Sequence, residues 1–161
     1  MIEEDKNSID EAIENLISIY PMLSKSLGKS IRNKTNQTPG SLFLLGVLAH
    51  HGILSMTEIG CHLSIPKPHV TNLIDKLISE ELVERLDDPT DRRIVKVRIT
   101  QKGVEEFNSV KLEVTQNLRQ KLQLLEADKI QTLSEASGRV KDILRVLALM
   151  QQPSSVVFAC K

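Results

Sequence analysis

Residues 82–103 read LVERLDDPTDRRIVKVRITQKG and predict a β-hairpin. A short strand pattern begins at residue 83, and alternating β-branched residues at 94–99 form a second one. Residues 87–90 are Asp, Asp, Pro and Thr, which favour a turn and do not continue a strand. The stretch is therefore expected to be a two-stranded ribbon with a long tip.

The tip of this hairpin is charged. Asp91 precedes Arg92 and Arg93, so the ribbon carries two guanidinium groups outward beside a carboxylate that can orient one of them. Such a tip suits a phosphate backbone or a narrow minor groove, where arginine is attracted by the concentrated negative potential. A solvated charged turn fits the same residues equally well.

Two short helices are predicted before the hairpin, within residues 55–77, which read SMTEIGCHLSIPKPHVTNLIDKL. Ser55 or Thr57 is a suitable cap for the first helix, and Glu58 lies in its first turn. Gly60 costs roughly 1 kcal/mol relative to alanine inside a helix. We therefore expect another helix backbone to approach closely at this glycine.

The second helix follows a turn at residues 64–67, with Pro66 or Pro68 in its first turn. Apolar residues at helical spacing should pack inward, namely Val70, Leu73, Ile74 and Leu77. The remaining positions should face outward and form the candidate recognition surface: Lys67, Pro68, His69, Thr71, Asn72 and Lys76.

The order of helix, helix and hairpin is that of a helix-turn-helix followed by a wing. The outward residue types suit DNA, since asparagine pairs with adenine, and lysine with guanine or phosphate. An ordinary polar helix face is the alternative interpretation. The arginines at the hairpin tip favour DNA recognition over it.

The stretch from Thr57 to Gly103 resembles the winged helix-turn-helix of the MarR family of bacterial transcriptional regulators. Four segments carry the resemblance: VTNLIDKL at 70–77, LVER at 82–85, DPTDRR at 88–93 and ITQKG at 99–103. The resemblance implies a homodimer that binds double-stranded DNA at a palindromic operator and represses transcription. It also implies that Arg93, held by Asp91, enters the minor groove while Thr71 and its neighbours lie in the major groove.

Two positions depart from the family pattern. Members often have a basic residue where Asn72 stands, so sequence preference or phosphate contacts are expected to differ. Members also commonly have glycine where Glu81 stands at the end of the second helix. A left-handed helix cap would penalise glutamate at that position.

The flanking segments predict long amphipathic helices, so the expected fold is mainly α with a small β-hairpin (α+β). Apolar residues recur at steps of three and four before the winged helix, where Pro21 is expected to kink the helix or to mark a boundary. A helix at 42–52 is apolar nearly all round and should be central, and two more helices should follow a cap at Thr100. Their apolar stripes exceed what one winged helix covers, which favours a homodimer; a monomeric bundle is the alternative.

The expected organisation is one interlocked domain. Residues 1–35 and 101–152 should form the helical dimerisation region, and residues 36–100 the winged helix-turn-helix. Residues 153–161 form a tail with no assigned role.

The composition agrees with a small regulator but does not add a basic signature. The chain has 161 residues, 40% of them hydrophobic, with 21 basic and 21 acidic residues. Because many nucleic-acid binders are strongly basic, DNA affinity must come from local patches. Candidate phosphate contacts are Lys29, Arg32, Lys34, Thr38, Ser55 and Arg85. A solvated helix end explains the first three equally well.

Effector control is implied by the resemblance alone. Family members commonly lose DNA affinity when a small aromatic or phenolic ligand fills the crevice between the dimerisation helices and the winged helix. Residues expected near that crevice are Tyr20, Leu23, Leu27, Phe43, Val47 and His51. Ordinary core packing is the alternative role for each of them.

Other classes of function have less support. We expect no cofactor and no metal site, because neither a CxxC motif nor a pair of histidines at i, i+4 is present. We expect no enzyme, because no catalytic motif is recognisable. Redox sensing at Cys61 and a protein-binding adaptor or antagonist of another regulator stay as alternatives. The absence of a signal sequence and of a transmembrane run predicts a cytoplasmic protein, and two cysteines do not form a disulfide framework.

Overall fold

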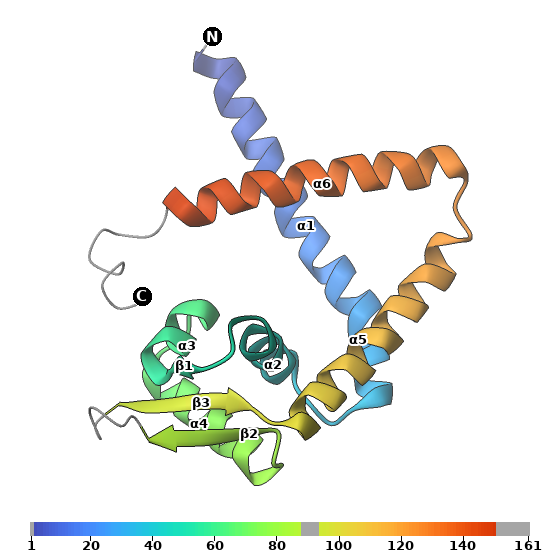
Figure 1. Cartoon of the computed structure of the whole chain (residues 1–161). Coiled ribbons are helices and arrows are strands. Elements are labelled where there is room, and N and C mark those ends of the chain that lie inside the picture. The colour runs from blue at the N-terminus through green and yellow to red at the C-terminus, as the bar shows by residue number, and fades with distance from the viewer. Residues whose placement is uncertain (1, 88–93, 151–161) are drawn as a thin grey trace.

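The computed structural model describes residues 2–87 and 94–150, with side chains from residue 7 onward (Figure 1). It consists mainly of helices with one small antiparallel sheet, which confirms the predicted fold class. The wing-tip residues Asp91, Arg92 and Arg93 and the tail 153–161 lie outside the described residues.

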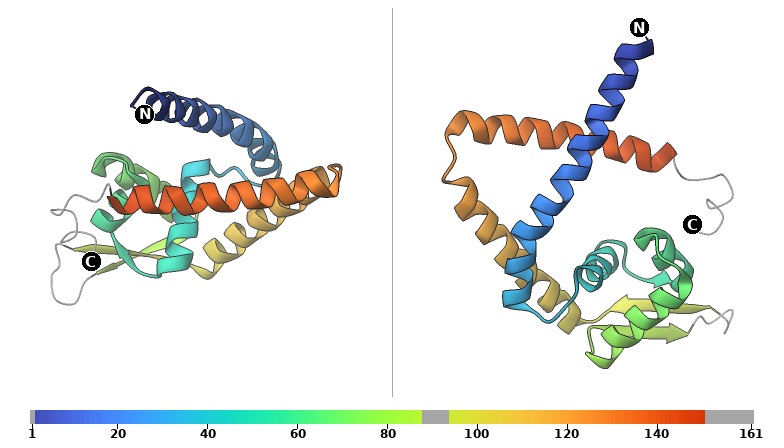
Figure 2. Two further views of the ribbon diagram at one scale, coloured as in Figure 1. Left: turned by 90° about the horizontal axis from the view of Figure 1, so that it is seen from above. Right: turned by 180° about the vertical axis from the view of Figure 1, so that it is seen from behind.

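Three long helices form an open frame above the winged helix (Figures 1 and 2). They are α1 (Ile2–Lys34), α5 (Gln101–Leu122) and α6 (Ala127–Met150). Helices α1 and α5 lie side by side, whereas none of the described side chains of α6 is buried. Pro21 lies inside α1 and does not divide it, so of the two predicted roles the boundary between shorter helices is wrong. In the described parts of the chain, no helix has both the length and the apolarity to cross a bilayer.

Helix α2 (Pro39–His51) is the centre of the core, as its sequence predicts. Leu44, Leu45 and Leu48 have no exposed surface. The helix begins three residues before the expected start, because Thr38 caps it by accepting a hydrogen bond from the Ser41 amide at 3.1 Å.

The helix-turn-helix consists of α3 (Met56–Leu63) and α4 (Lys67–Ser79). Ser55 caps α3 in a reciprocal capping box with Glu58, which selects one of the two predicted caps. On α4, Val70, Ile74 and Leu77 are fully buried, as predicted, while Leu73 packs at the edge of the core. This packing turns the polar side of α4 away from the protein.

The close backbone approach expected at Gly60 is found elsewhere. A Cβ atom added at Gly60 would lie 3.6 Å from the Ile65 carbonyl oxygen and from the Val70 side chain, which is ordinary contact. At Gly103, in the first turn of α5, an added Cβ would lie 2.1 Å from the carbonyl oxygen of Leu82. Glycine at 103 is therefore what lets α5 begin directly against the segment that follows α4.

The sheet has three antiparallel strands in the order β1-β3-β2. The predicted hairpin is β2 (Val83–Asp87) and β3 (Val95–Ile99), and β1 (Leu54–Ser55) pairs with β3. Two residues are too few to show strand alternation, which is why β1 escaped prediction. Asp87, expected in the turn, is the last residue of β2 because it pairs with Val95.

The expected strain at Glu81 is present. Its φ is 61°, and the bonds Leu82 N–H to Leu77 C=O and Glu81 N–H to Ile78 C=O form a Schellman cap. The Glu81 carboxylate pairs with Lys102 at 2.8 Å, and this contact lowers its pKa. Glu81 thus has a backbone conformation that favours glycine, and its side chain forms an ion pair with Lys102.

Histidines gather where α2 meets α3. The ring of His51 lies 4.8 Å from that of His50 and 4.6 Å from that of His62. Partial desolvation lowers the pKa of His62 although its side chain is exposed, nearby His51 lowers it further, and Glu58 opposes the shift. The folded protein therefore resists protonation of this histidine.

Replacing Glu81 by glycine should stabilise the protein by about 1 kcal/mol, because glycine adopts positive φ without the Cβ penalty. Urea unfolding measures the change. Glu81→Ala is the matched control, since it also removes the Lys102 ion pair but keeps the strain. Equal stability of the two variants would contradict the strained cap.

Stability should fall as the pH falls below 6.5, the ordinary pKa of histidine, because the unfolded chain protonates His62 more readily than the folded chain. Thermal unfolding between pH 8 and pH 5 should show a smaller loss in His62→Gln than in the wild type. His51→Gln should relieve part of the loss, as it removes one cause of the shift. Superimposable pH profiles for the wild type and His62→Gln would refute this role.

Candidate nucleic-acid interface

The six residues predicted on the recognition surface all lie on α4. Lys67, Pro68, His69 and Asn72 are exposed, whereas Thr71 and Lys76 are half-buried. The opposite side of the helix is buried in the core. The helix therefore presents one continuous polar face whose orientation the core determines.

A hollow of about 510 Å³ lies between the helix-turn-helix and the hairpin. It brings together Ser55 from the start of α3, Lys67 and Thr71 from α4, and Arg85 from β2. The Thr71 hydroxyl donates to the Lys67 carbonyl oxygen at 3.2 Å. Four predicted contact residues from three segments thus line one concave surface.

Asp75 contacts one of these lining residues, and sequence reasoning missed it. Its carboxylate accepts a hydrogen bond from the Arg85 guanidinium at 2.6 Å, and both side chains are about half exposed. The contact joins the recognition helix to the first wing strand. Helical spacing could have indicated this residue, because Asp75 follows Asn72 by three residues and so lies on the same face of the helix.

A second ion pair connects the two strands of the hairpin. Arg98 on β3 pairs with Glu84 directly opposite it on β2, with distances of 2.8 and 2.9 Å. Both arginines of the described hairpin strands therefore face carboxylates. Each of these positive charges therefore already has an acidic partner within the protein.

The candidate phosphate contacts have different surroundings. Lys29, Arg32 and Lys34 are exposed near the end of α1. The hydroxyls of Thr38 and Ser55 serve as helix caps, and Ser55 also donates to Glu58 at 2.7 Å. These two hydroxyls therefore already have structural partners.

The candidate effector residues do not share one set of neighbours. Leu23 lines an apolar groove of about 670 Å³ between α1 and α6, Val47 packs against the core, and His51 contacts His62. Tyr20 and Phe43 are 75% and 56% exposed, and Leu27 is half-buried.

Cys61, the candidate redox residue, is half-buried and not in a disulfide. Within residues 2–87 and 94–150, no three His, Cys, Asp or Glu side chains are grouped to hold a metal ion.

Comparison with known proteins identifies the fold and the family. Residues 38–95, from the cap of α2 to the start of β3, match the model of the MarR family. The chain is 26% identical over 121 residues to the HTH-type transcriptional regulator MhqR of Bacillus subtilis (strain 168), covering 75% of this chain and 83% of that protein. It is 27% identical over 106 residues to the HTH-type transcriptional repressor MdtR of the same organism, covering 64% of this chain and 68% of that one.

A solved structure gives the same result. The crystal structure of a cysteine-to-serine mutant of MarR from E. coli, complexed with operator DNA, is similar with a TM-score of 0.63 at 26% identity. The similarity covers 80% of this chain and 93% of that one. With its helix-turn-helix, its paired wing strands and these relatives, the chain belongs to the MarR family of winged helix-turn-helix regulators.

Proposed function

We propose that this protein is a transcriptional regulator that binds double-stranded DNA in a sequence-specific manner. One observation carries the proposal: the polar face of α4 and the wing strands border one hollow that gathers Ser55, Lys67, Thr71 and Arg85. A helix whose apolar side is fully anchored enters a major groove as a rigid body. The similarity to a MarR structure complexed with operator DNA supports the same function.

In this proposal the residues of α4 read bases and the wing contacts the backbone and the minor groove. Asn72 is the best candidate for a base contact, since its exposed amide matches the donor and acceptor pattern of adenine. Lys67, His69 and Lys76 contact phosphates or base edges. Arg93, oriented by Asp91, enters the minor groove from the wing tip, and Arg92 adds positive charge beside it.

Charge makes the wing tip especially important. The chain is neutral overall, and Arg85 and Arg98 are paired with carboxylates. Non-specific attraction depends on the number of cations that neutralise phosphates. Lys29, Arg32, Lys34 and the tip arginines therefore supply the main electrostatic attraction in our proposal.

A second copy of the chain is the proposed partner. The apolar residues of α1 and α6 are widely exposed, among them Ile17 at 68%, Ile143 at 61% and Leu149 at 72%. The groove between these helices is lined by Ile19, Leu23, Leu133, Val140 and Leu144. Exposed apolar surfaces of this extent usually mark an interface.

A homodimer built on residues 1–35 and 101–152 presents two recognition helices related by a two-fold axis. Such a pair matches a palindromic operator. Occupation of a promoter by this dimer blocks polymerase, so repression is the proposed sign of regulation. The relative MdtR, named a repressor, supports this choice.

Effector control is the finer part of the proposal. A small aromatic or phenolic ligand that favours a protomer spacing mismatched to the two half-sites lowers DNA affinity by shifting the conformational population. The exposed side chains of Tyr20, Leu23 and Phe43 offer apolar surface for such a ligand. Titrating a DNA-bound sample with phenolic compounds, and following release by gel shift, tests this part.

The protein should bind DNA from upstream of its own gene in a gel shift at low salt, and Asn72→Ala should lose preference at one base pair. We expect about 1–3 kcal/mol less discrimination at that position, the value of one bidentate contact. Duplexes with single base-pair substitutions measure it. Asn108→Ala, the same change at an exposed position of α5, is the control and should keep wild-type preference. Absence of wild-type binding would refute the function.

Leu144→Asp should convert the dimer to a monomer, because it places a charge in the apolar groove between α1 and α6. Light scattering after size exclusion measures the mass, and operator affinity should fall with it. Leu124→Asp, at a position 86% exposed between α5 and α6, should stay dimeric. A dimeric Leu144→Asp protein would show that the partner covers another surface.

A further inference from the structure

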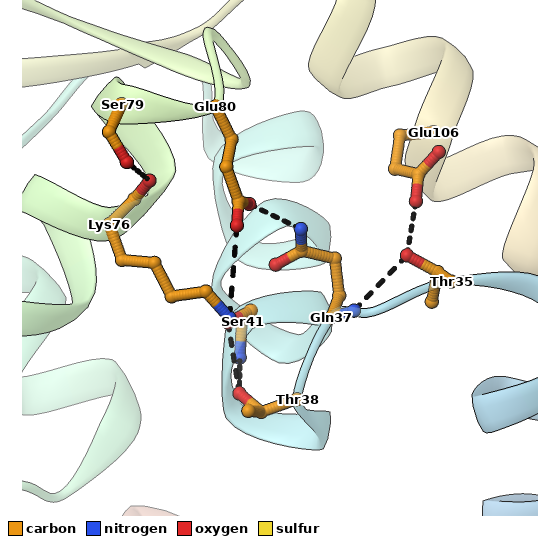
Figure 3. A network of polar contacts seen from close by, with 8 residues as sticks. All are labelled: Thr35, Gln37, Thr38, Ser41, Lys76, Ser79, Glu80 and Glu106. Carbon is orange, nitrogen blue, oxygen red and sulfur yellow. Dashed lines mark hydrogen bonds and ion pairs between the residues drawn. The ribbon is translucent and has the colours of Figure 1, made fainter.

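A chain of polar contacts connects α5 to the end of the recognition helix (Figure 3). The Thr35 hydroxyl donates to the carboxylate of Glu106 on α5, and the Gln37 backbone amide donates to Thr35 Oγ1 at 3.2 Å. The Gln37 side-chain amide then donates to Glu80 at the end of α4. The segment between α1 and α2 thus bridges the long helices and the recognition helix.

Glu80 is the centre of this arrangement. One carboxylate oxygen accepts the hydrogen bond from Gln37, and the other lies 3.9 Å from the Nζ atom of Lys76, one turn earlier on α4. The side chains of Lys76 and Glu80 are 39% and 34% exposed. The only candidate DNA contact in the last turn of the described α4 therefore has a carboxylate beside it.

Helix capping does not explain a glutamate at this position. The cap bonds of α4 use backbone groups, and the C-terminal end of a helix dipole favours a cation over an anion. The side chain of Glu80 makes its polar contacts with Gln37 and Lys76. The role of the Glu80 carboxylate is therefore to be found in these two contacts.

The consequence for DNA concerns Lys76. An ammonium group that already faces a carboxylate releases fewer counterions when it meets a phosphate, and non-specific affinity follows the number of such contacts. Gln37 holds the carboxylate in place, so the competition does not disappear when DNA approaches. The arrangement lowers attraction to any DNA sequence without removing a base contact.

We propose that Glu80 is a positioning residue that acts through Lys76: anchored by Gln37, it holds the ammonium group at the end of α4 and limits non-specific attraction to DNA. This inference rests on the proposed function. Glu80 thereby lowers the part of the affinity that does not depend on sequence. Gln37 and Thr35 connect its position to α5.

The test is the salt dependence of binding to a duplex without the operator, measured between 50 and 200 mM salt. Glu80→Gln keeps an acceptor for Gln37 but loses the charge, so Lys76 gains a phosphate contact. The slope of log K against log salt should steepen by about 0.9, which makes the affinity loss over this range about 3.5-fold larger than in the wild type.

Two comparisons separate this role from charge and from folding. In a Lys76→Gln background, Glu80→Gln should leave the slope unchanged, because the lysine through which it acts is absent. Glu126→Gln makes the same charge change in an exposed pair with Lys129, 3.4 Å apart at the start of α6, and should keep the wild-type slope. Urea midpoints of all variants show whether α4 stays folded.

The outcomes are distinguishable. If the wild type binds its operator but Glu80→Gln keeps the wild-type slope, the inference fails and the proposed function stands. A steeper slope that persists without Lys76 also overturns it, since the effect then bypasses the lysine. If the wild type binds neither duplex at low salt, the proposed function fails and the inference falls with it.

Discussion

The structure depends on the packing of α4 against the core. Val70, Ile74 and Leu77 are fully buried together with the leucines of α2. Since these three residues occupy one side of the helix, their burial decides which side chains point outward. A helix anchored in this way presents its polar face as a rigid surface, which the proposed reading of base edges requires.

The two ends of α4 are held in different ways. At its start, the turn after α3 brings Lys67 and Thr71 next to the wing strands. At its end, a strained cap at Glu81 and the contacts of Glu80 connect the helix to α5 and to the segment after α1. The carboxyl end of α4 therefore contacts the long-helix part of the protein, whereas its start contacts the wing.

The protein has no net excess of positive charge, and basic residues of the candidate interface are paired with carboxylates. The chain is neutral, and its interface arginine Arg85 and lysine Lys76 each face a carboxylate. Such pairs are worth little as stabilising contacts because they are exposed. Their effect on DNA is larger, since each one reduces the positive charge available to phosphates. In our proposal the protein thereby limits its sequence-independent affinity for DNA.

The sequence by itself determined the features set by local patterns. The order of the helices and the hairpin, the cap at Thr100 and the buried side of α4 follow from spacing and residue type within a few positions. The structure selected Ser55 from the two possible caps of α3, and the expectation of strain at Glu81 came from the family resemblance. Only the tertiary structure decided the Asp75–Arg85 contact, the close approach at Gly103 and the connection from Gln37 to Glu80. These features join segments far apart in the chain, whose distances depend on how the helices pack and leave no periodic signal in the sequence.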